Sequence, residues 1–181
     1  MSQMHQMQLT YVPKEDRILF RLNTKNRQEY RFWLTRRYVA ILWKTISRLV
    51  QDSEREETEI EETGPPSLTD PIAESAKIEI EHQEIISQAD FQTQYQESSY
   101  LPLGEEPALL FSVGVKPNPD GTPLLCLHPE KGEGIELALN DQILHSFCQL
   151  VVETVNRAGW ALDLRFSGPS SDSEKEGPGL N

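Results

Sequence analysis

The chain has few cysteines and no long apolar run. Its 181 residues include two cysteines, Cys126 and Cys148, and they form no CxxC pair. We therefore expect neither a disulfide framework nor a cysteine-based metal site. No stretch approaches the ~20 apolar residues that a membrane-spanning helix needs. Residues 1–8 also lack the basic and apolar regions of a secretory signal. Together these absences predict a cytoplasmic protein that makes no contact with a membrane.

Local motifs of catalysis are also missing. The sequence contains no phosphate-binding glycine loop and no nucleophile elbow. Its four histidines share no ligand spacing with one another or with the cysteines; they are His5, His82, His128 and His145. We expect no catalytic residue, no metal and no cofactor. An enzyme stays an open alternative, because an active site assembled across a fold leaves no local trace.

Charge is divided unevenly along the chain, whose formal net charge is −12. Residues 1–50 contain ten Lys and Arg against three Asp and Glu, a balance of +7. Residues 51–181 contain seven Lys and Arg against 26 Asp and Glu, a balance of −19. A strongly acidic total repels nucleic acid at long range, but a local basic surface can still bind it.

Residues 1–50 have the pattern of three strands followed by a helix. Two runs of alternating apolar and polar residues flank the polar turn 13–16, and "EYRFWL" at 29–34 alternates in the same way. Thr35 stands where a helix N-cap belongs. Beyond it, apolar residues recur at helical spacing; they are Val39, Leu42, Trp43, Ile46, Leu49 and Val50. The expected unit is βββα.

Residues 107–166 repeat this plan. "ALLFSVGV" and "PLLCLH" flank a turn that contains Asp120-Gly121, and "GIELALN" at 134–140 supplies a third strand. Asn140 is placed as an N-cap before a helical stripe of Leu144, Phe147, Cys148, Val151 and Val155. A last alternating stretch, "WALDLRF" at 160–166, predicts a seventh strand.

The two units align with a single offset of 105 residues, which indicates an internal duplication. Neither unit could cover its own sheet alone. We therefore expect an α+β fold in which two βββα units form one antiparallel sheet with two helices on one face.

Residues 51–106 form the expected insert between the units. The acidic run 51–66 ends in Gly-Pro-Pro and is typical of a solvated linker. Residues 70–96 predict a helix with Asp70 as cap and Pro71 in its first turn, although "KIEIEH" within it alternates like a strand. The tail, 167–181, is expected to be disordered.

"EYRFWLTRR" at 29–37 is the candidate binding segment. Side chains alternate between the faces of a strand, so Arg31 and Trp33 point away from the predicted helices, as do Arg17 and Arg21 on the preceding strand. The complete candidate face is Arg17, Arg21, Arg27, Arg31, Trp33, Arg36 and Arg37. Arginine beside exposed aromatic rings is typical of single-stranded nucleic-acid platforms.

A structural interpretation competes with this one. Arginine stems cover apolar sheet surface, and Trp33 could pack under the insert or against a second subunit. The acidic residues between Asp52 and Glu62 could also fold over the arginines as a salt-sensitive guard. We favour a non-enzymatic interaction protein that binds a protein partner or a second copy as a dimer, with single-stranded nucleic-acid binding as the alternative.

Two resemblances accompany these patterns. The duplicated plan resembles the curved-sheet, two-helix fold of the PUR-repeat and Whirly families, which bind single-stranded nucleic acid; their repeats usually have four strands where three are predicted here. The segments "RFWLTRR", "QADFQTQY", "PLGEEP" and "GIELALNDQILHSFCQL" resemble blocks of an uncharacterised bacterial family. That second likeness implies no activity.

Overall fold

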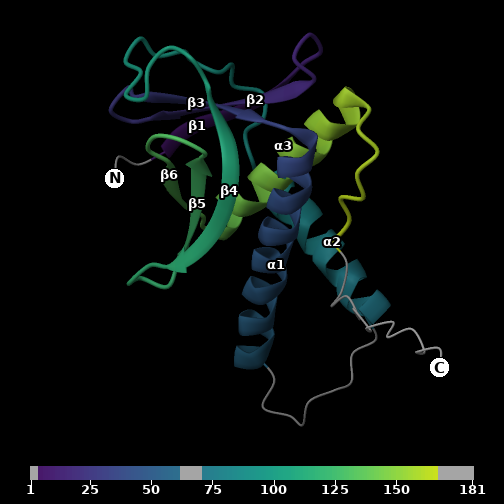
Figure 1. The fold of residues 1–181 in the computed structure, drawn as a ribbon. Coiled ribbons are helices and arrows are strands. Elements are labelled where there is room, and N and C mark those ends of the chain that lie inside the picture. The colour runs from purple at the N-terminus through teal and green to yellow at the C-terminus, as the bar shows by residue number, and fades with distance from the viewer. Residues whose placement is uncertain (1–3, 62–70, 167–181) are drawn as a thin grey trace, which may run out of the picture.

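The structure is a computed structural model that describes residues 4–61 and 71–166. It is an α+β fold with a six-stranded mixed sheet and three helices (Figure 1). The elements follow one another as β1 (Met4–Val12), β2 (Arg17–Thr24), β3 (Glu29–Leu34), α1 (Arg36–Glu61), α2 (Pro71–Ser87), β4 (Ala108–Pro117), β5 (Pro123–Pro129), β6 (Ile135–Ala138) and α3 (Asp141–Ala158). The βββα order therefore occurs twice, with α2 between the two units.

Strands lie in the sheet in sequence order from β1 to β6, and one expectation about their directions is wrong. Within each unit the pairs are antiparallel, but β3 and β4 pair in parallel through Phe32 with Ala108 and Trp33 with Leu109. The reason is geometric. The third strand of an up-down-up unit runs in the direction of its first, so a second unit placed beside it in the same orientation meets it in parallel. The helical crossover 35–107 has the length that such a pairing needs.

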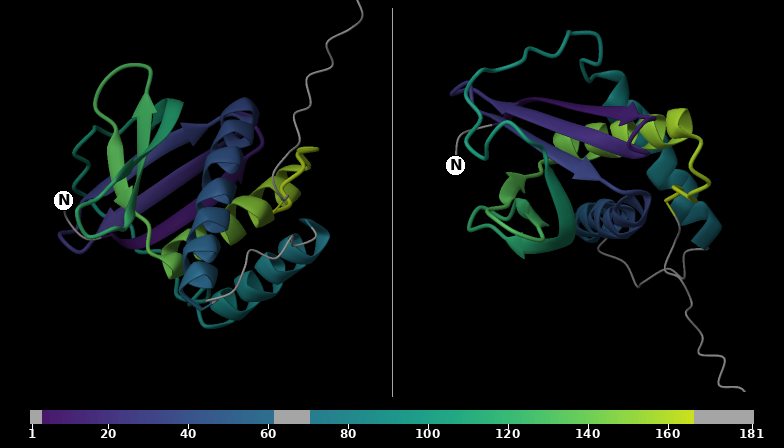
Figure 2. Two further views of the ribbon diagram at one scale, coloured as in Figure 1. Left: turned by 90° about the horizontal axis from the view of Figure 1, so that it is seen from below. Right: turned by 45° about the horizontal axis from the view of Figure 1, so that its top comes forward.

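Helices α1 and α3 pack on the inner face of the sheet, and each covers the other unit. Helix α3 contacts β1, whereas α1 contacts β4. The rings of Phe20 on β2 and Phe147 on α3 lie 5.5 Å apart between centroids. Figure 2 shows α1 and α3 on one side of β1–β3. The helical stripes predicted from the sequence are buried, apart from the half-buried Leu49.

The predicted N-caps at Thr35 and Asn140 are both present. The Thr35 hydroxyl accepts a hydrogen bond from the Tyr38 amide at 3.2 Å. The Asn140 side chain accepts one from the Ile143 amide at 2.9 Å. Helix α3 ends at Ala158 and is capped by Gly159, whose φ of 65° is the left-handed conformation that closes many helices.

Three other expectations need correction. The acidic run is not a linker from residue 51, because α1 continues to Glu61; adding residues to an existing helix needs no new nucleus. Helix α2 begins at Pro71 as predicted but ends at Ser87, before the predicted end at 96. Residues 160–166 form no strand. Their alternation reflects packing, since Trp160 and Phe166 are buried against the core.

The Asp70 cap and the disordered tail at 167–181 were predicted for residues outside the described part of the chain. Among the described residues, no helix is long and apolar enough to cross a bilayer.

Candidate functional site

The outer face of β1–β3 carries the predicted arginines in cross-strand rows. Arg21 on β2 lies opposite Arg31 on β3, with Gln8 on β1 beside Arg21. Leu19 lies opposite Trp33 in the next row. Two like charges directly opposite each other destabilise a sheet. This face therefore needs carboxylates near the two arginines.

Residues 94–100, which we call the strap, run across this outer face. The backbone carbonyl of Gln94 accepts a hydrogen bond from the Gln6 side chain, and that of Gln96 accepts one from Asn23 at 2.7 Å. The Tyr100 carbonyl accepts one from the Glu29 amide at 2.9 Å. Figure 2 shows that the chain after α2 crosses β1–β3 on the side opposite the helices. The insert thus covers the face that we assigned to ligand binding.

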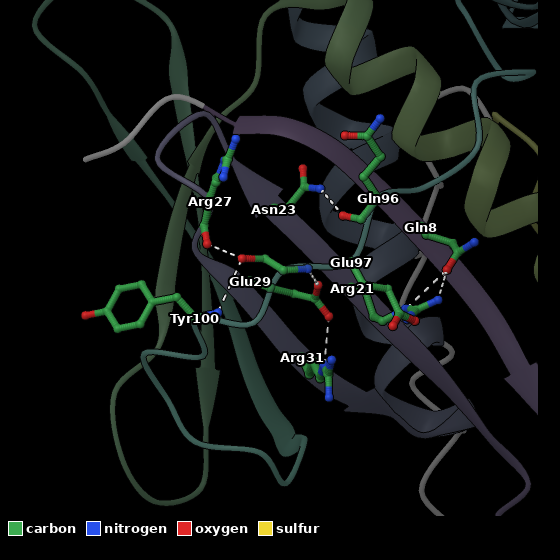
Figure 3. A network of polar contacts seen from close by, with 10 residues as sticks. Gln8, Arg21, Asn23, Arg27, Glu29, Arg31, Gln96, Glu97 and Tyr100 are labelled. Carbon is green, nitrogen blue, oxygen red and sulfur yellow. Dashed lines mark hydrogen bonds and ion pairs between the residues drawn. The ribbon is translucent and has the colours of Figure 1, made fainter.

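The strap supplies one of the two carboxylates. Glu97 forms an ion pair with Arg21, which lowers the pKa of the Glu97 carboxyl. The Arg21 guanidinium also lies 4.9 Å from the centroid of the Tyr95 ring, a cation–π contact. Burial raises the pKa of Tyr95. Arg21 is consequently enclosed by the strap (Figure 3).

Glu29 supplies the second carboxylate, and its side chain is fully buried. One of its oxygens accepts a hydrogen bond from Arg31 Nε at 2.7 Å, and the other accepts one from the Ser98 amide at 2.7 Å. The contact with Glu29 raises the pKa of Arg31. Figure 3 shows Glu29 between Arg31 and the strap. Glu29 therefore both neutralises an arginine and fastens the strap to the sheet.

The other predicted residues do not take part in the contacts of Arg21 and Arg31 with Glu97 and Glu29. Arg17 lies at the start of β2, 3.9 Å from Glu15. Arg27 lies in the β2–β3 turn with a φ of 58°, and its backbone carbonyl accepts a hydrogen bond from the Ser98 hydroxyl. Arg36 and Arg37 are exposed in the first turn of α1, at the opposite end of β3. Trp33 is half-buried. Nucleic-acid binding by this face stays a prediction.

The proposed acidic guard also stays a prediction. Helix α1 carries the run as far as Glu61, and Figure 1 shows this end of the helix pointing away from β1–β3. The side chains from Glu54 to Glu61 lie outside the described residues. The carboxylates paired with Arg21 and Arg31 come instead from Glu97 and Glu29.

A second candidate site is the groove beside β6, a cleft of about 670 Å³. The six consecutive residues from Glu133 to Ala138 line it, so side chains from both faces of β6 contribute. The groove therefore runs along the edge of this strand. Its remaining walls come from β1–β3, the loop before β4, the β4–β5 turn, β5, and the cap and first turn of α3: Met4, Leu22, Thr24, Tyr30, Pro102, Leu103, Asn118, Thr122, Leu124, Asn140 and Ile143.

The lining of the groove is mostly apolar, and both of its charged residues are acidic. The lining residues include Glu133 and Glu136 but no Lys, Arg or His. Glu136 pairs with Lys116, whereas Glu133 is exposed beside Tyr30. Burial and the Glu133 charge both raise the pKa of Tyr30. Such a site favours a ligand with an apolar body and a cationic group.

A third cluster is a pair of buried histidines between α2 and α3. His82 Nδ1 and His145 Nδ1 lie 2.9 Å apart, and the two side chains are almost completely buried. Burial lowers the pKa of both, that of His145 to about 4. Neither histidine lines the groove beside β6. No group of three metal-ligating side chains occurs in the described parts of the chain.

Sequence patterns did not reveal the strap, the groove or the histidine pair. The strap has no apolar period, and three of its anchors are backbone carbonyls that any residue could provide. The alternation of Glu29 and Arg31 was a signal for one ion pair, because residues i and i+2 share a face of a strand. Comparison with protein-family models, curated proteins and solved structures gives no match for the chain.

Proposed function

We propose that the chain is a non-enzymatic cytoplasmic interaction protein that binds an extended segment of a partner protein along β6. The observation that carries the proposal is the groove of about 670 Å³ that follows the edge of this strand. A peptide in the groove would add a seventh strand to the sheet. Two free, buried cysteines agree with a reducing compartment.

The backbone of β6 supports strand addition. This strand ends the sheet order and pairs only with β5 within the described residues. Its other edge therefore presents backbone donors and acceptors that a partner strand can satisfy. Backbone bonds give such complexes affinity, and pockets for alternate side chains give them specificity.

The groove also specifies the chemistry of its occupant. Alternate side chains of an added strand would face Leu22, Tyr30 and Leu103, which favours apolar residues at those positions. The exposed carboxylate of Glu133 favours Lys or Arg nearby. The expected partner segment is extended, apolar at alternate positions and flanked by basic residues.

The alternative function is binding of single-stranded nucleic acid by the outer face. The strap would have to leave before bases could stack on that face, because Glu97 and Tyr95 already occupy Arg21. The closed strap therefore favours the β6 groove.

We also propose that the two βββα units arose by duplication. Helices α1 and α3 begin 105 residues apart, at Arg36 and Asp141. A tandem repeat of one unit would place the six strands in sequence order and pair β3 with β4 in parallel, as they are in this sheet.

Fluorescence anisotropy tests the proposed function. The probes are labelled ten-residue peptides with alternating Val and Thr, flanked by Lys in one set and Glu in the other. We expect the Lys-flanked set to bind at least tenfold more tightly. Ala138→Trp fills the groove from an exposed position and should abolish binding. Ser112→Trp places the same ring at an exposed position of β4 and should leave binding unchanged. Glu133→Lys should reverse the charge preference.

Anisotropy and sedimentation together separate peptide binding from nucleic-acid binding and from dimer formation. Labelled single-stranded DNA and RNA at two salt concentrations test the nucleic-acid hypothesis, because phosphate contacts give a steep salt dependence. Sedimentation of the free chain tests dimer formation through β6. Peptide binding unaffected by Ala138→Trp, or absence of binding by every peptide set, would refute the groove as the site.

A further inference from the structure

Helix α2 is held to the molecule by few buried side chains. Among residues 72–87, whose side chains the structure describes, only Ile78 and His82 are buried. Ile72 and Ile80 are largely exposed. His82 is therefore one of the two buried side chains of residues 72–87, and its ring contacts His145 on α3 and Phe166.

The contact between the histidines requires at least one uncharged ring. At 2.9 Å, one Nδ1 must donate a proton and the other must accept it. When both rings are protonated, both Nδ1 atoms are donors and two positive charges face each other in a buried site. The hydrogen bond then becomes a repulsion.

We propose that the His82–His145 pair is a pH-sensitive latch that releases helix α2 from α3 as the solution becomes acidic. Release would uncover the face of α3 around His145 and loosen the connection that leads from α2 into the strap. This inference is independent of the peptide groove.

The surrounding groups do not cancel the effect. Glu79 on α2 and the side chain of Gln149 on α3 favour protonation of His82, and Asp141 on α3 favours protonation of His145. Desolvation is nevertheless the largest influence on the pKa of each ring, and it lowers both. Phe166 is uncharged, and no described group of α1 or β1 acts on either pKa.

The sign of the pH effect follows from these directions. A released α2 exposes histidines of ordinary pKa, near 6.5, whereas the attached state lowers that of His145 to about 4. The released state binds more protons between these values, so attachment is strongest above pH 6.5 and weakens as the pH falls toward 4. When the pH falls from 7.5 to 5.0, protonation of His145 alone raises the fraction of molecules with α2 released by roughly 30-fold.

Hydrogen exchange followed by mass spectrometry on the full chain tests the latch. After correction for intrinsic rates, wild-type amides at 72–87 should exchange roughly 30-fold faster at pH 5.0 than at pH 7.5, while those of β2 and β3 keep their protection. The double variant His82→Asn/His145→Asn, which cannot titrate, should change less than threefold. His128→Asn removes an exposed histidine and should behave as the wild type.

Two results would overturn the proposal: a change below threefold in the wild type, or equal acceleration in α2 and the sheet. A direct measurement covers the case in which the double variant does not fold. NMR titration of the histidine Cε1 protons should give pKa values below the ordinary 6.5 for both rings, with that of His145 at about 4. A value near 6.5 with α2 still protected would refute the latch.

Discussion

Glu29 is the residue whose removal should most affect the strap. We consider Glu29→Ala, which deletes a fully buried carboxylate on β3. Two hydrogen bonds end on this group, from Arg31 Nε and from the Ser98 amide, each at 2.7 Å. The change leaves a guanidinium and a backbone amide without their acceptor beneath the strap.

The expected loss follows from these contacts. A hydrogen bond to a charged group contributes ~1.5–3 kcal/mol. The Arg31 side chain is 25% exposed and regains water, so its bond counts at the low end of that range. We expect Glu29→Ala to lower the free energy of unfolding by ~3–4 kcal/mol in total. Glu29→Gln keeps the shape and one acceptor oxygen, so its loss should be ~1–2 kcal/mol.

Urea and thermal denaturation measure this loss. At ~2–4 °C per kcal/mol for a chain of this size, Glu29→Ala should lower Tm by roughly 6–16 °C. Hydrogen exchange should increase first in the strap, residues 94–100. The control is Glu97→Gln, whose carboxylate is 67% exposed and should matter little. The role given to Glu29 is wrong if the free energy of unfolding of Glu29→Ala lies within ~1 kcal/mol of the wild-type value. It is also wrong if Glu97→Gln lowers that free energy by as much as Glu29→Ala does.

Three further changes test the packing and the helix ends, each by urea denaturation. Phe147→Ala removes a buried ring at the junction of α3 and β2 and should lower stability by ~3–5 kcal/mol, against little effect for the exposed Phe111→Ala. Asn140→Ala removes the cap of α3 and should lower it by ~1 kcal/mol, whereas Asn140→Ser should retain most of it. Gly159→Ala, at a φ of 65°, should lower it by ~1–2 kcal/mol; an unchanged midpoint there would contradict the left-handed cap.

Local structure could be predicted from the sequence where one period or one cap determined it. The strands around 29–34, the helical stripes and the caps at Thr35 and Asn140 follow from neighbouring residues alone. The parallel pairing of β3 with β4 could also have been predicted, because it follows from placing two up-down-up units side by side in one orientation.

The candidate sites could not be predicted in the same way. The strap binds the sheet largely through backbone atoms, and these are the same for almost every residue type, so the sequence does not indicate them. The groove is lined by residues from several strands, two loops and α3 that are distant in the sequence and come together only in the folded sheet. His82 and His145 are 63 positions apart, and only the packing of α2 on α3 brings them together.

Helix α3 covers the strands of the first unit, and α1 covers β4 of the second. This arrangement determines when the inner face of β1–β3 can be covered during synthesis. Phe20 emerges from the ribosome 127 residues before Phe147, the ring against which it packs. At ~5–20 residues per second, the inner face of β1–β3 waits roughly 6–25 s for α3. The strap emerges well before α3 and can close the outer face first. A nascent chain therefore passes through an interval in which the N-terminal sheet is fastened on its polar side but uncovered on its apolar side, where a chaperone would bind.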